Sequence, residues 1–319
     1  MARVFDLAMT HGLDSDDFFV HRVQERCAQK AMNFFLIEPL WVESFLAFFE
    51  SGALSVRVLL NMHSEHHNPN EPFHRLVKTA ANRGVLMIDD PGVALAAFDK
   101  ARFHSRLLDA GMPVPTTLIV GRAEVEAFAF GPALFEKLGS TFVIKPSTGY
   151  GRRGVVMDAC RREDLLRSMK EWPGSHYLLQ RKILPRQHQG RPVYFRAFFV
   201  FGKIWVCQWN CFTDAYQKGL LSEDPELGAY HERIVALVSR LAGLCGMHFF
   251  STEIAVDERD ELCLIDYVND QCHMLTQSSS PRNGVPDELV SSIAISLVDG
   301  AWSMIHPESS VSPVHSPEP

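Results

Sequence analysis

The stretch Thr141–Met157, TFVIKPSTGYGRRGVVM, is the most informative segment of the sequence. An apolar run ends in Lys145, a loop with three glycines follows, and a second apolar run closes the stretch. Glycines let backbone N–H groups approach anionic oxygens because no Cβ stands in the way, and a lysine at a strand end adds a fixed positive charge. The stretch therefore predicts a strand, a loop and a second strand that together bind a chain of phosphates.

Two familiar phosphate-binding motifs match these glycines but not their surroundings. Residues Gly149–Gly154 read G-x-G-x-x-G, as in dinucleotide-binding proteins, and with Val156 they also fit the protein-kinase glycine loop. The dinucleotide motif requires a helix directly after the glycines, whereas Val155–Met157 has the pattern of a strand. The kinase motif places its lysine after the loop and requires H-R-D and D-F-G downstream, but Lys145 precedes the loop and neither tripeptide occurs. Both motifs are excluded, and a plain glycine turn is the remaining alternative.

The composition is that of a soluble protein large enough for two or three lobes. The chain has 319 residues, of which 46% are hydrophobic and 22% charged. A net charge of -7 argues against a nucleic-acid or anionic-membrane partner. No apolar run suggests a membrane span, the N-terminus lacks a signal-like segment, and the seven cysteines form no C-x-x-C pair. We therefore expect a cytoplasmic protein with reduced thiols and with no nucleic-acid or membrane partner.

The first 98 residues alternate between strand and helix patterns, which predicts an open α/β domain with a mostly parallel sheet. A polar loop at 61–70 carries His63, His66 and His67 where such sheets bind ligands, so these histidines are candidate metal or substrate contacts. A solvated loop is the alternative. The expected elements are a helix at Asp16–Gln29, a strand at Asn33–Ile37, a helix at Trp41–Glu50, a strand at Val56–Leu60, a helix at Pro72–Asn82, a strand at Val85–Ile88 and, further along, an interrupted helix at Glu124–Leu138.

A second hairpin carries two carboxylates that are predicted to face each other. Two apolar strands flank a charged turn, and a turn centred on Arg259 and Asp260 puts Glu253 directly opposite Asp266. With Cβ atoms about 5 Å apart, the two charges would repel by about 3 kcal/mol at an effective dielectric of about 20. A divalent cation would offset that repulsion, so the pair is a candidate metal site. A shared proton, or outward-facing carboxylates with water between them, is the alternative.

Together these features resemble the ATP-grasp superfamily, in which a glycine-rich hairpin folds over the phosphates of ATP. A second point of resemblance is the order Asp90-Pro91, then Asp99-Lys100, then L-x-x-x-G-x-P-x-P-T ending at Thr116, which is similar to the linker in glutathione synthetase and the ribosomal-protein glutamate ligases. The resemblance covers about residues 85–303. It implies an N-terminal α/β (pre-ATP-grasp) domain at 1–98, an ATP-grasp domain at 99–305 with a lid subdomain at about 115–185 and a C-terminal subdomain at about 186–305, and a disordered tail at 306–319.

The resemblance also assigns residues to ATP. Arg181 stands where relatives usually carry an acidic residue, which leaves backbone groups to read the edge of adenine. For Lys100, a plain surface lysine is the alternative. The implied ATP-binding residues are Lys100 and Lys145 at the phosphates, Ser147, Thr148, Gly149, Gly151 and Gly154 in the loop, and Gln180, Arg181, Lys182 and Ile183 in a hinge beside adenine.

In ATP-grasp enzymes the second hairpin carries an Asp on its first strand and E-x-N on its second, and together they hold magnesium. The matching residues here are Glu253, Asp266 and Asn269, and Mn²⁺ could replace Mg²⁺. The two acids are exchanged in length, and the spacing is D-x-x-N. Residues three apart on a regular strand face opposite sides, so either a bulge after Tyr267 restores the geometry or Asp270, on the face of Asp266, replaces Asn269.

Three arginines complete the candidate site. Arg196 lies in the aromatic segment Tyr194–Phe198, where strand alternation puts it on a mixed face suited to the wall of a pocket. The resemblance implies catalytic roles for Arg196 and Lys145, and Arg196 is also expected to contact substrate. Arg152 and Arg153, at the tip of the glycine loop, are expected to close on phosphate or on a substrate carboxylate. A solvent-facing position is the alternative for Arg196.

The resemblance implies an ATP-dependent, Mg²⁺-requiring ligase that forms C–N bonds by joining a carboxylate to an amine, or to a thiol, through an acyl phosphate. The substrates would be small molecules or peptides, and a homo-oligomer is consistent with the family. Two alternatives stay open. One is a small-molecule kinase on the same scaffold, like the inositol polyphosphate kinases, and the other is a non-catalytic nucleotide-binding protein, which the D-x-x-N spacing would favour.

Overall fold

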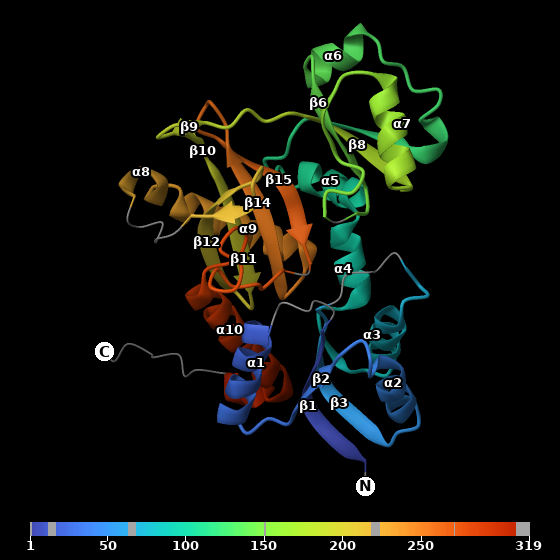
Figure 1. Cartoon of the computed structure of the whole chain (residues 1–319), viewed down its shortest axis with the longest axis vertical. Helices are drawn as coiled ribbons and strands as arrows, with labels where there is room; N and C mark the ends of the chain where they lie inside the picture. Colours follow the sequence, from blue (N-terminus) through green and yellow to red (C-terminus); the bar gives the residue numbers. More distant parts are fainter. Residues whose placement is uncertain are drawn as a thin grey trace, which may run out of the picture.

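The computed structural model contains three main β-sheets, arranged one after another along the long axis of the molecule (Figure 1). The candidate ligands His63, His66 and His67 lie outside the residues that the structure describes, as does Tyr150 of the glycine loop. All seven cysteines are free thiols, as the sequence predicts, but they are not all core residues: Cys160 is exposed, and Cys207 and Cys211 are only partly buried. The described residues are 2–11, 17–62, 68–149, 151–217, 224–270 and 272–310.

The N-terminal sheet is fully parallel, with the strand order β2-β1-β3-β4. The sequence patterns miss its central strand β1, because the charged Asp6 interrupts the apolar run; the Asp6 carboxylate accepts a hydrogen bond from Asn33 N (2.8 Å). Helices α2 and α3 pack on one face, and α1 and α10 on the other (Figure 1). The elements are β1 (Arg3–Thr10), α1 (Asp17–Gln29), β2 (Phe34–Ile37), α2 (Val42–Glu50), β3 (Leu54–Leu60), α3 (Pro72–Asn82) and β4 (Leu86–Ile88), with α10 (Asp287–Ile305) arriving from the end of the chain.

The central sheet is antiparallel, with the strand order β13-β12-β11-β14-β15. Tyr194 and Phe198 pack into the core shared with the N-terminal sheet, and Phe195 and Ala197 into the core beneath α4, α5 and α9. Arg196 therefore shares a face with Tyr194 and Phe198, as strand alternation predicts. The elements are α4 (Pro91–Phe98), α5 (Lys100–Asp109), β11 (Tyr194–Val200), β12 (Lys203–Asn210), β13 (Ala215–Tyr216), α9 (His231–Cys245), β14 (Phe249–Val256) and β15 (Leu262–Asn269).

The third sheet forms a separate layer with the strand order β5-β8-β6-β7. The expected helix over Glu124–Leu138 is wrong in its first half: Phe130 packs on Phe142 with ring centroids 6.1 Å apart, which holds 125–131 as irregular chain. The helix begins only at Pro132, a residue well suited to the first helical position. The elements are β5 (Thr117–Gly121), a 3-10 turn at Arg122–Glu124, α6 (Pro132–Leu138), β6 (Phe142–Pro146), β7 (Val156–Ala159), α7 (Arg162–Glu171) and β8 (His176–Arg181).

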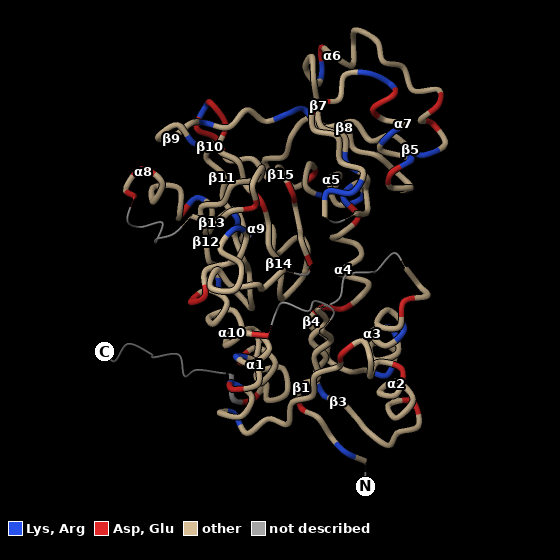
Figure 2. The backbone as a smooth tube through the Cα atoms, viewed as in Figure 1, with Lys and Arg blue, Asp and Glu red and all other residues tan. Residues whose placement is uncertain are grey.

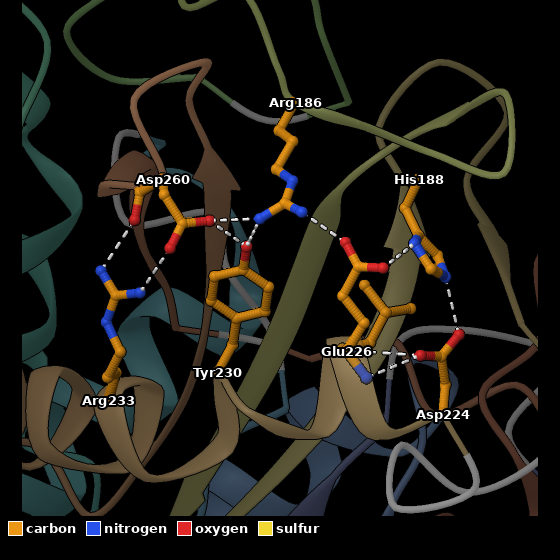
Figure 3. A network of polar contacts seen from close by, with 8 residues as sticks. Arg186, His188, Asp224, Glu226, Tyr230, Arg233 and Asp260 are labelled. Atoms are coloured by element: carbon orange, nitrogen blue, oxygen red, sulfur yellow. Dashed lines mark hydrogen bonds and ion pairs between the residues drawn. The ribbon is translucent and has the colours of Figure 1, made fainter.

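A polar network lies at the N-terminal end of α9, beside the turn between β14 and β15 (Figure 3). Arg186 pairs with Glu226 on one side and with Asp260 on the other. His188 lies between Asp224 (2.8 Å) and Glu226 (3.1 Å). Solvent screens exposed pairs of this kind and makes each of them weak, so the network chiefly fixes where the surrounding turns lie. Its elements are β9 (Gln187–His188), β10 (Arg191–Pro192) and α8 (Pro225–Gly228).

Contrary to the sequence expectation, one described helix, α10, is long and apolar enough to cross a membrane, with a mean hydropathy of 1.3. Half of that window is buried inside the protein, where Leu289, Ile293 and Leu297 pack in the core beside α1. Burial against α1 and the sheets explains its apolar composition. The predicted tail begins with a short 3-10 helix, Pro307–Ser310, and 311–319 lie outside the described residues.

Asp89, at the end of β4, links the N-terminal sheet to the central sheet. Its buried carboxylate accepts hydrogen bonds from His248 N (2.7 Å), His248 Nδ1 (2.8 Å) and Phe249 N (3.0 Å). The hydrogen bond to Asp89 raises the pKa of the His248 ring above its usual value, although burial opposes this. The start of β14 is thus anchored by the first sheet.

We expect Asp89→Asn to lower the free energy of unfolding by about 1–3 kcal/mol. The amide NH₂ would replace one carboxylate oxygen, so that a buried backbone N–H would face another donor and lose its hydrogen bond. Asp90→Asn is the matched control, because asparagine caps α4 about as well as the aspartate does. Urea unfolding near pH 6 measures the difference. An unchanged midpoint for Asp89→Asn would contradict the anchor.

The cost of Asp89→Asn should also depend on pH. Because the pKa of His248 is raised in the folded state, its pairing with Asp89 stabilises fully below about pH 6.5 and is lost as the pH rises through the raised value. The stability difference between wild type and variant should therefore shrink on going from pH 6 to about pH 9. Repeating the urea series at both pH values measures this; a difference that grows with pH would rule it out.

Candidate functional site

A cleft of about 530 Å³ lies between the third sheet and the central sheet. Figure 2 shows basic residues beside α5 and acidic residues along β14 and β15, the elements that border the cleft. Three predicted residues, Ser147, Thr148 and Gly154, do not line it. The predicted residues that do line it are Lys100, Lys145, Gly149, Gly151, Arg152, Arg153, Gln180, Arg181, Lys182, Ile183, Arg196, Glu253, Asp266 and Asn269.

Lys145 extends from β6 across to the central sheet. Its Nζ donates a hydrogen bond to Ile265 O (2.6 Å) on β15. Burial lowers the pKa of Lys145, and the nearby carboxylates of Asp266 and Glu253 oppose that shift. A lysine held in this way places its amine in a water-poor site, where an anionic ligand would favour the charged form and interact with it strongly.

Lys100, the first residue of α5, holds the glycine loop. Its backbone N donates to Ser147 O (2.8 Å) and its Nζ to Gly149 O (3.3 Å). The same Nζ lies 3.6 Å from Asp266 Oδ1. Lys100 is therefore a partly buried lysine between the loop and the acidic strands, which argues against the plain surface lysine.

The predicted pairing of Glu253 with Asp266 is confirmed. Next to the turn the strand pairing is shifted by one residue from the prediction, because Val256 pairs with Leu262. An extra residue on β15 before Asp266 restores the predicted pairing with Glu253. A second extra residue after Asp266 brings Asn269 onto the cleft face. The bulge alternative is therefore correct in geometry.

Asn269, and not Asp270, completes the group of side chains around the carboxylates. Asn269 lines the cleft, and its Nδ2 donates to Ser251 O (3.5 Å), which leaves the amide oxygen available as a ligand. Asp270 is buried at 7% exposure and does not line the cleft. Its proposed substitution for Asn269 has no support in the geometry.

The donor set around Glu253 and Asp266 fits a hard divalent cation. Asp266 Oδ1 is buried without a hydrogen-bond partner among the described residues, although it lies near Lys100. Burial raises the pKa of Glu253 to about 7, with Arg196 lowering it and Asp266 raising it further. In the described part of the chain no three acidic, histidine or cysteine side chains form a metal cage. Mg²⁺ is typically bound by one or two carboxylates with substrate phosphates, which matches this arrangement.

Arg196 points into the cleft from β11. Its Nε and a terminal nitrogen donate to Ser251 Oγ (3.2 and 3.1 Å), and its other terminal nitrogen lies 3.7 Å from Glu253. The guanidinium lies over the Trp209 ring, 5.5 Å from its centroid. The solvent-facing alternative for Arg196 is thereby excluded, because its side chain is 18% exposed.

The glycine loop is held from behind by the end of α7 and the residues after it. Trp172 Nε1 donates to Thr148 O (2.6 Å), and Ser168 Oγ donates to Gly154 O (2.5 Å). Gly154 has a φ of +70°, and an added Cβ would lie 2.7 Å from Trp172 Cβ and 2.9 Å from Pro146 Cγ. Thr148 and Gly154 thus shape the loop from outside the cleft.

The tip of the loop reaches across the mouth of the cleft. Arg152 donates to Cys211 O and to Asp214 Oδ1 (2.7 Å) in the turn between β12 and β13. Arg152 and Asp214 both adopt a φ of +59°. Arg153 lies instead over the Trp172 ring, at 5.5 Å from its centroid. In this conformation the guanidinium of Arg152, which was predicted to contact substrate, is bonded to the turn between β12 and β13.

The hinge residues divide into a buried and an exposed part. Gln180 directs its amide away from the cleft, to Thr117 Oγ1 (3.1 Å) and the Tyr267 hydroxyl (2.6 Å). Arg181 donates to Lys137 O (3.1 Å) at the end of α6. Since both side chains are engaged elsewhere, a base in the cleft would meet the backbone that follows, at Lys182 and Ile183.

The half of the cleft next to Arg196 consists of residues outside the predicted set of ligands. Half of them lie close together in sequence, around the turn between β12 and β13, and tertiary structure brings the others to them. Several are aromatic, and Phe212 packs edge-on against Tyr194 at 6.1 Å. These residues are Tyr194, Trp209, Cys211, Phe212, Tyr216, His273, Asn283 and Val285.

Comparison with known proteins shows the fold. No protein-family model and no curated protein sequence matches the chain. Among solved structures it is similar to a RimK domain ATP-grasp protein from Sphaerobacter thermophilus (18% identity, 93% of this chain and 98% of that one, TM-score 0.62). It is also similar to D-alanine–D-alanine ligase from Bacillus anthracis complexed with ATP (13%, 98% and 100%, 0.64) and to the ATP-grasp ligase PsnB complexed with minimal precursor, Mg and ADP (12%, 94% and 98%, 0.56). The chain has the ATP-grasp fold, as the sequence resemblance implies.

We expect Gly154→Ala to destabilise the glycine loop strongly. The positive φ costs about 1–2 kcal/mol for an L-residue, and the contact with Trp172 and Pro146 adds about 1–3 kcal/mol of overpacking. Gly151→Ala is the matched control, because Gly151 has a φ of +60° but open space around its Cβ position. Hydrogen exchange of the loop amides measures the effect. Equal exchange in the two variants would refute the packing role of Gly154.

Proposed function

We propose that the protein is an ATP-dependent ligase that activates a carboxylate as an acyl phosphate and joins it to an amine or a thiol. The observation that carries the proposal is the convergence, in one cleft, of a glycine loop with two partly buried lysines, a facing pair of carboxylates and a partly buried arginine. The first two suit a triphosphate, and the carboxylates suit its metal ion. Arg196 beside them suits a second anion. D-alanine–D-alanine ligase and PsnB, which share the fold, are named as ligases.

The residues would act mainly by neutralising charge and by positioning. A carboxylate oxygen of the substrate attacks the γ-phosphorus of ATP, and the bond to ADP breaks. The amine then attacks the acyl carbon, and phosphate leaves. Lys100, Lys145 and Arg196 would hold the phosphoryl oxygens while negative charge moves between them. Glu253, Asp266 and Asn269 would hold Mg²⁺, which supplies additional charge neutralisation when bound.

The glycine loop would protect the acyl phosphate from water. Its ends are fixed by Trp172 and Ser168, and its tip spans the cleft mouth through Arg152 and Asp214. A closed loop keeps solvent away from a reactive intermediate. The pair between Arg152 and Asp214 is half exposed on each side, so it is weak enough to open for exchange of substrates.

Lys145→Ala should lower kcat/KM for ATP by about tenfold or more, because it removes a buried cation from the phosphate site. Lys137→Ala, an exposed lysine on α6, is the control. The assay measures ADP release with Mg²⁺ across a panel of carboxylates and amines, with hydroxylamine as a trap. An acyl phosphate yields a hydroxamate, whereas a kinase yields a stable phosphorylated product and no hydroxamate. That second result would replace the ligase with a kinase.

Asp266→Asn should abolish Mg²⁺-dependent turnover and leave the fold intact, because it removes a carboxylate whose buried oxygen has no hydrogen-bond partner among the described residues. Glu261→Gln, in the exposed turn of the same hairpin, is the control. Turnover is measured over a Mg²⁺ series and the fold by circular dichroism. Nucleotide binding without turnover in the wild type would favour a non-catalytic protein.

A further inference from the structure

Strand β15 carries an extra residue on each side of Asp266, relative to β14. Without the first, Asp266 would share the face of Leu264, which packs in the core beneath the sheet. Without the second, Asn269 would point away from the cleft. The consequence on the other face is that Tyr267 and Val268, adjacent in sequence, both pack in the same core.

The hydroxyl of Tyr267 is held by side chains from two other elements. Gln180 Nε2 on β8 donates to it at 2.6 Å, and His104 Nδ1 on α5 lies 2.6 Å from it. The three residues are at most 2% exposed. The amide nitrogen of Gln180 donates to the tyrosine oxygen, and a neutral His104 with its proton on Nε2 can accept the tyrosine proton at Nδ1. Burial lowers the pKa of His104 and favours that neutral form.

Packing alone does not account for these polar groups. A phenylalanine at 267 and a leucine at 104 would fill similar space without a hydrogen bond in the core. Moreover, His104 Nε2 is buried without a hydrogen-bond partner among the described residues, which is a cost that an apolar side chain would avoid. A fully buried chain of hydrogen bonds holds its members in one geometry, and loosely bonded or apolar contacts hold them less strictly.

The position of the chain of hydrogen bonds indicates what it holds. Tyr267 directly follows Asp266, and bulges beside functional sites typically re-aim a side chain. Gln180 directly precedes Arg181–Ile183, the backbone that borders the other end of the cleft. The hydrogen bond between Gln180 and Tyr267 therefore ties the strand of the carboxylates to the strand at the opposite end of the cleft.

We propose that Tyr267 is a positioning residue: its hydroxyl, held between Gln180 and His104, keeps Asp266 and Asn269 on the cleft face and thereby sets the affinity for the metal ion that accompanies the nucleotide. The inference rests on the proposed function, because it presupposes a metal–nucleotide site. Tyr267 would contact neither the metal ion nor the nucleotide, and it would act only through Asp266 and Asn269 on the same strand.

Tyr267→Phe tests the inference, because it removes the hydroxyl and keeps the ring. Binding of Mn²⁺ in the presence of adenylyl imidodiphosphate, a non-hydrolysable ATP analogue, is measured by electron paramagnetic resonance. Loss of an outer contact to a metal ligand typically weakens metal binding by about 10–100-fold, and we expect about tenfold. Binding of the analogue without metal should change less than twofold, and ATP turnover should recover at high Mg²⁺.

Tyr230→Phe is the matched control. Tyr230 packs in the same core and its hydroxyl bonds to Arg186 and Asp260, but it lies in the network at the far end of the sheet (Figure 3). This variant should bind Mn²⁺ like the wild type. His104→Leu removes the other partner of the Tyr267 hydroxyl. This variant should also weaken Mn²⁺ binding, and it serves as the test if Tyr267→Phe does not fold.

Each outcome decides the question. Weaker Mn²⁺ binding in Tyr267→Phe and His104→Leu, with Tyr230→Phe unchanged, supports the inference. Wild-type Mn²⁺ affinity in folded Tyr267→Phe or His104→Leu overturns it and leaves the proposed function standing. Equal weakening in Tyr230→Phe also overturns it, because the effect would then be general loss of stability. A wild type without nucleotide-dependent Mn²⁺ binding overturns the proposed function, and the inference with it.

Discussion

Two partly buried carboxyl groups face each other across neighbouring strands, and the cations around them follow from that constraint. Burial raises the pKa of Glu253 to about 7, and Asp266 adds to the rise. Lys100 lies 3.6 Å from Asp266, and Arg196 lies 3.7 Å from Glu253. Lys145 reaches the same strand through a backbone carbonyl. Charges that are buried in this way persist only when they are paired, and the pairing draws three separate segments of chain to one place.

Those cations also hold the layers together. Lys145 comes from the third sheet and bonds to the central sheet, and Lys100 comes from α5 and bonds to the glycine loop. Asp89 performs a similar task at the other end of the molecule, where the first sheet caps the start of β14. The first and central sheets therefore meet through the Asp89 contacts as well as through a shared apolar core, and the central and third sheets are joined through Lys145 and Lys100. A cleft between two layers remains because the layers are joined at its borders.

Several features were predictable because they depend on neighbours in sequence. The strands around the glycine loop follow from apolar runs, and Asp90 and Asp99 cap the helices that they precede. The strand β1 was missed because the charged Asp6 obscures its apolar pattern. The helix expected over Glu124–Leu138 was half wrong, since aromatic contacts with a strand that follows in sequence override local propensity. Ser147, assigned to ATP, lies fully buried behind the loop.

By itself the sequence determined which residues carry charge, where glycines permit a tight loop, and that the two acids lie on the facing strands of one hairpin. Tertiary structure decided which of these residues share a cleft. The spacing of Asp266 and Asn269 shows why: a regular strand would turn them to opposite faces, and the extra residue of β15 between them reverses that result. On the opposite face of β15 from the cleft, Tyr267 contacts Gln180 of β8 and His104 of α5. Such contacts join residues distant in sequence, so no local pattern records them.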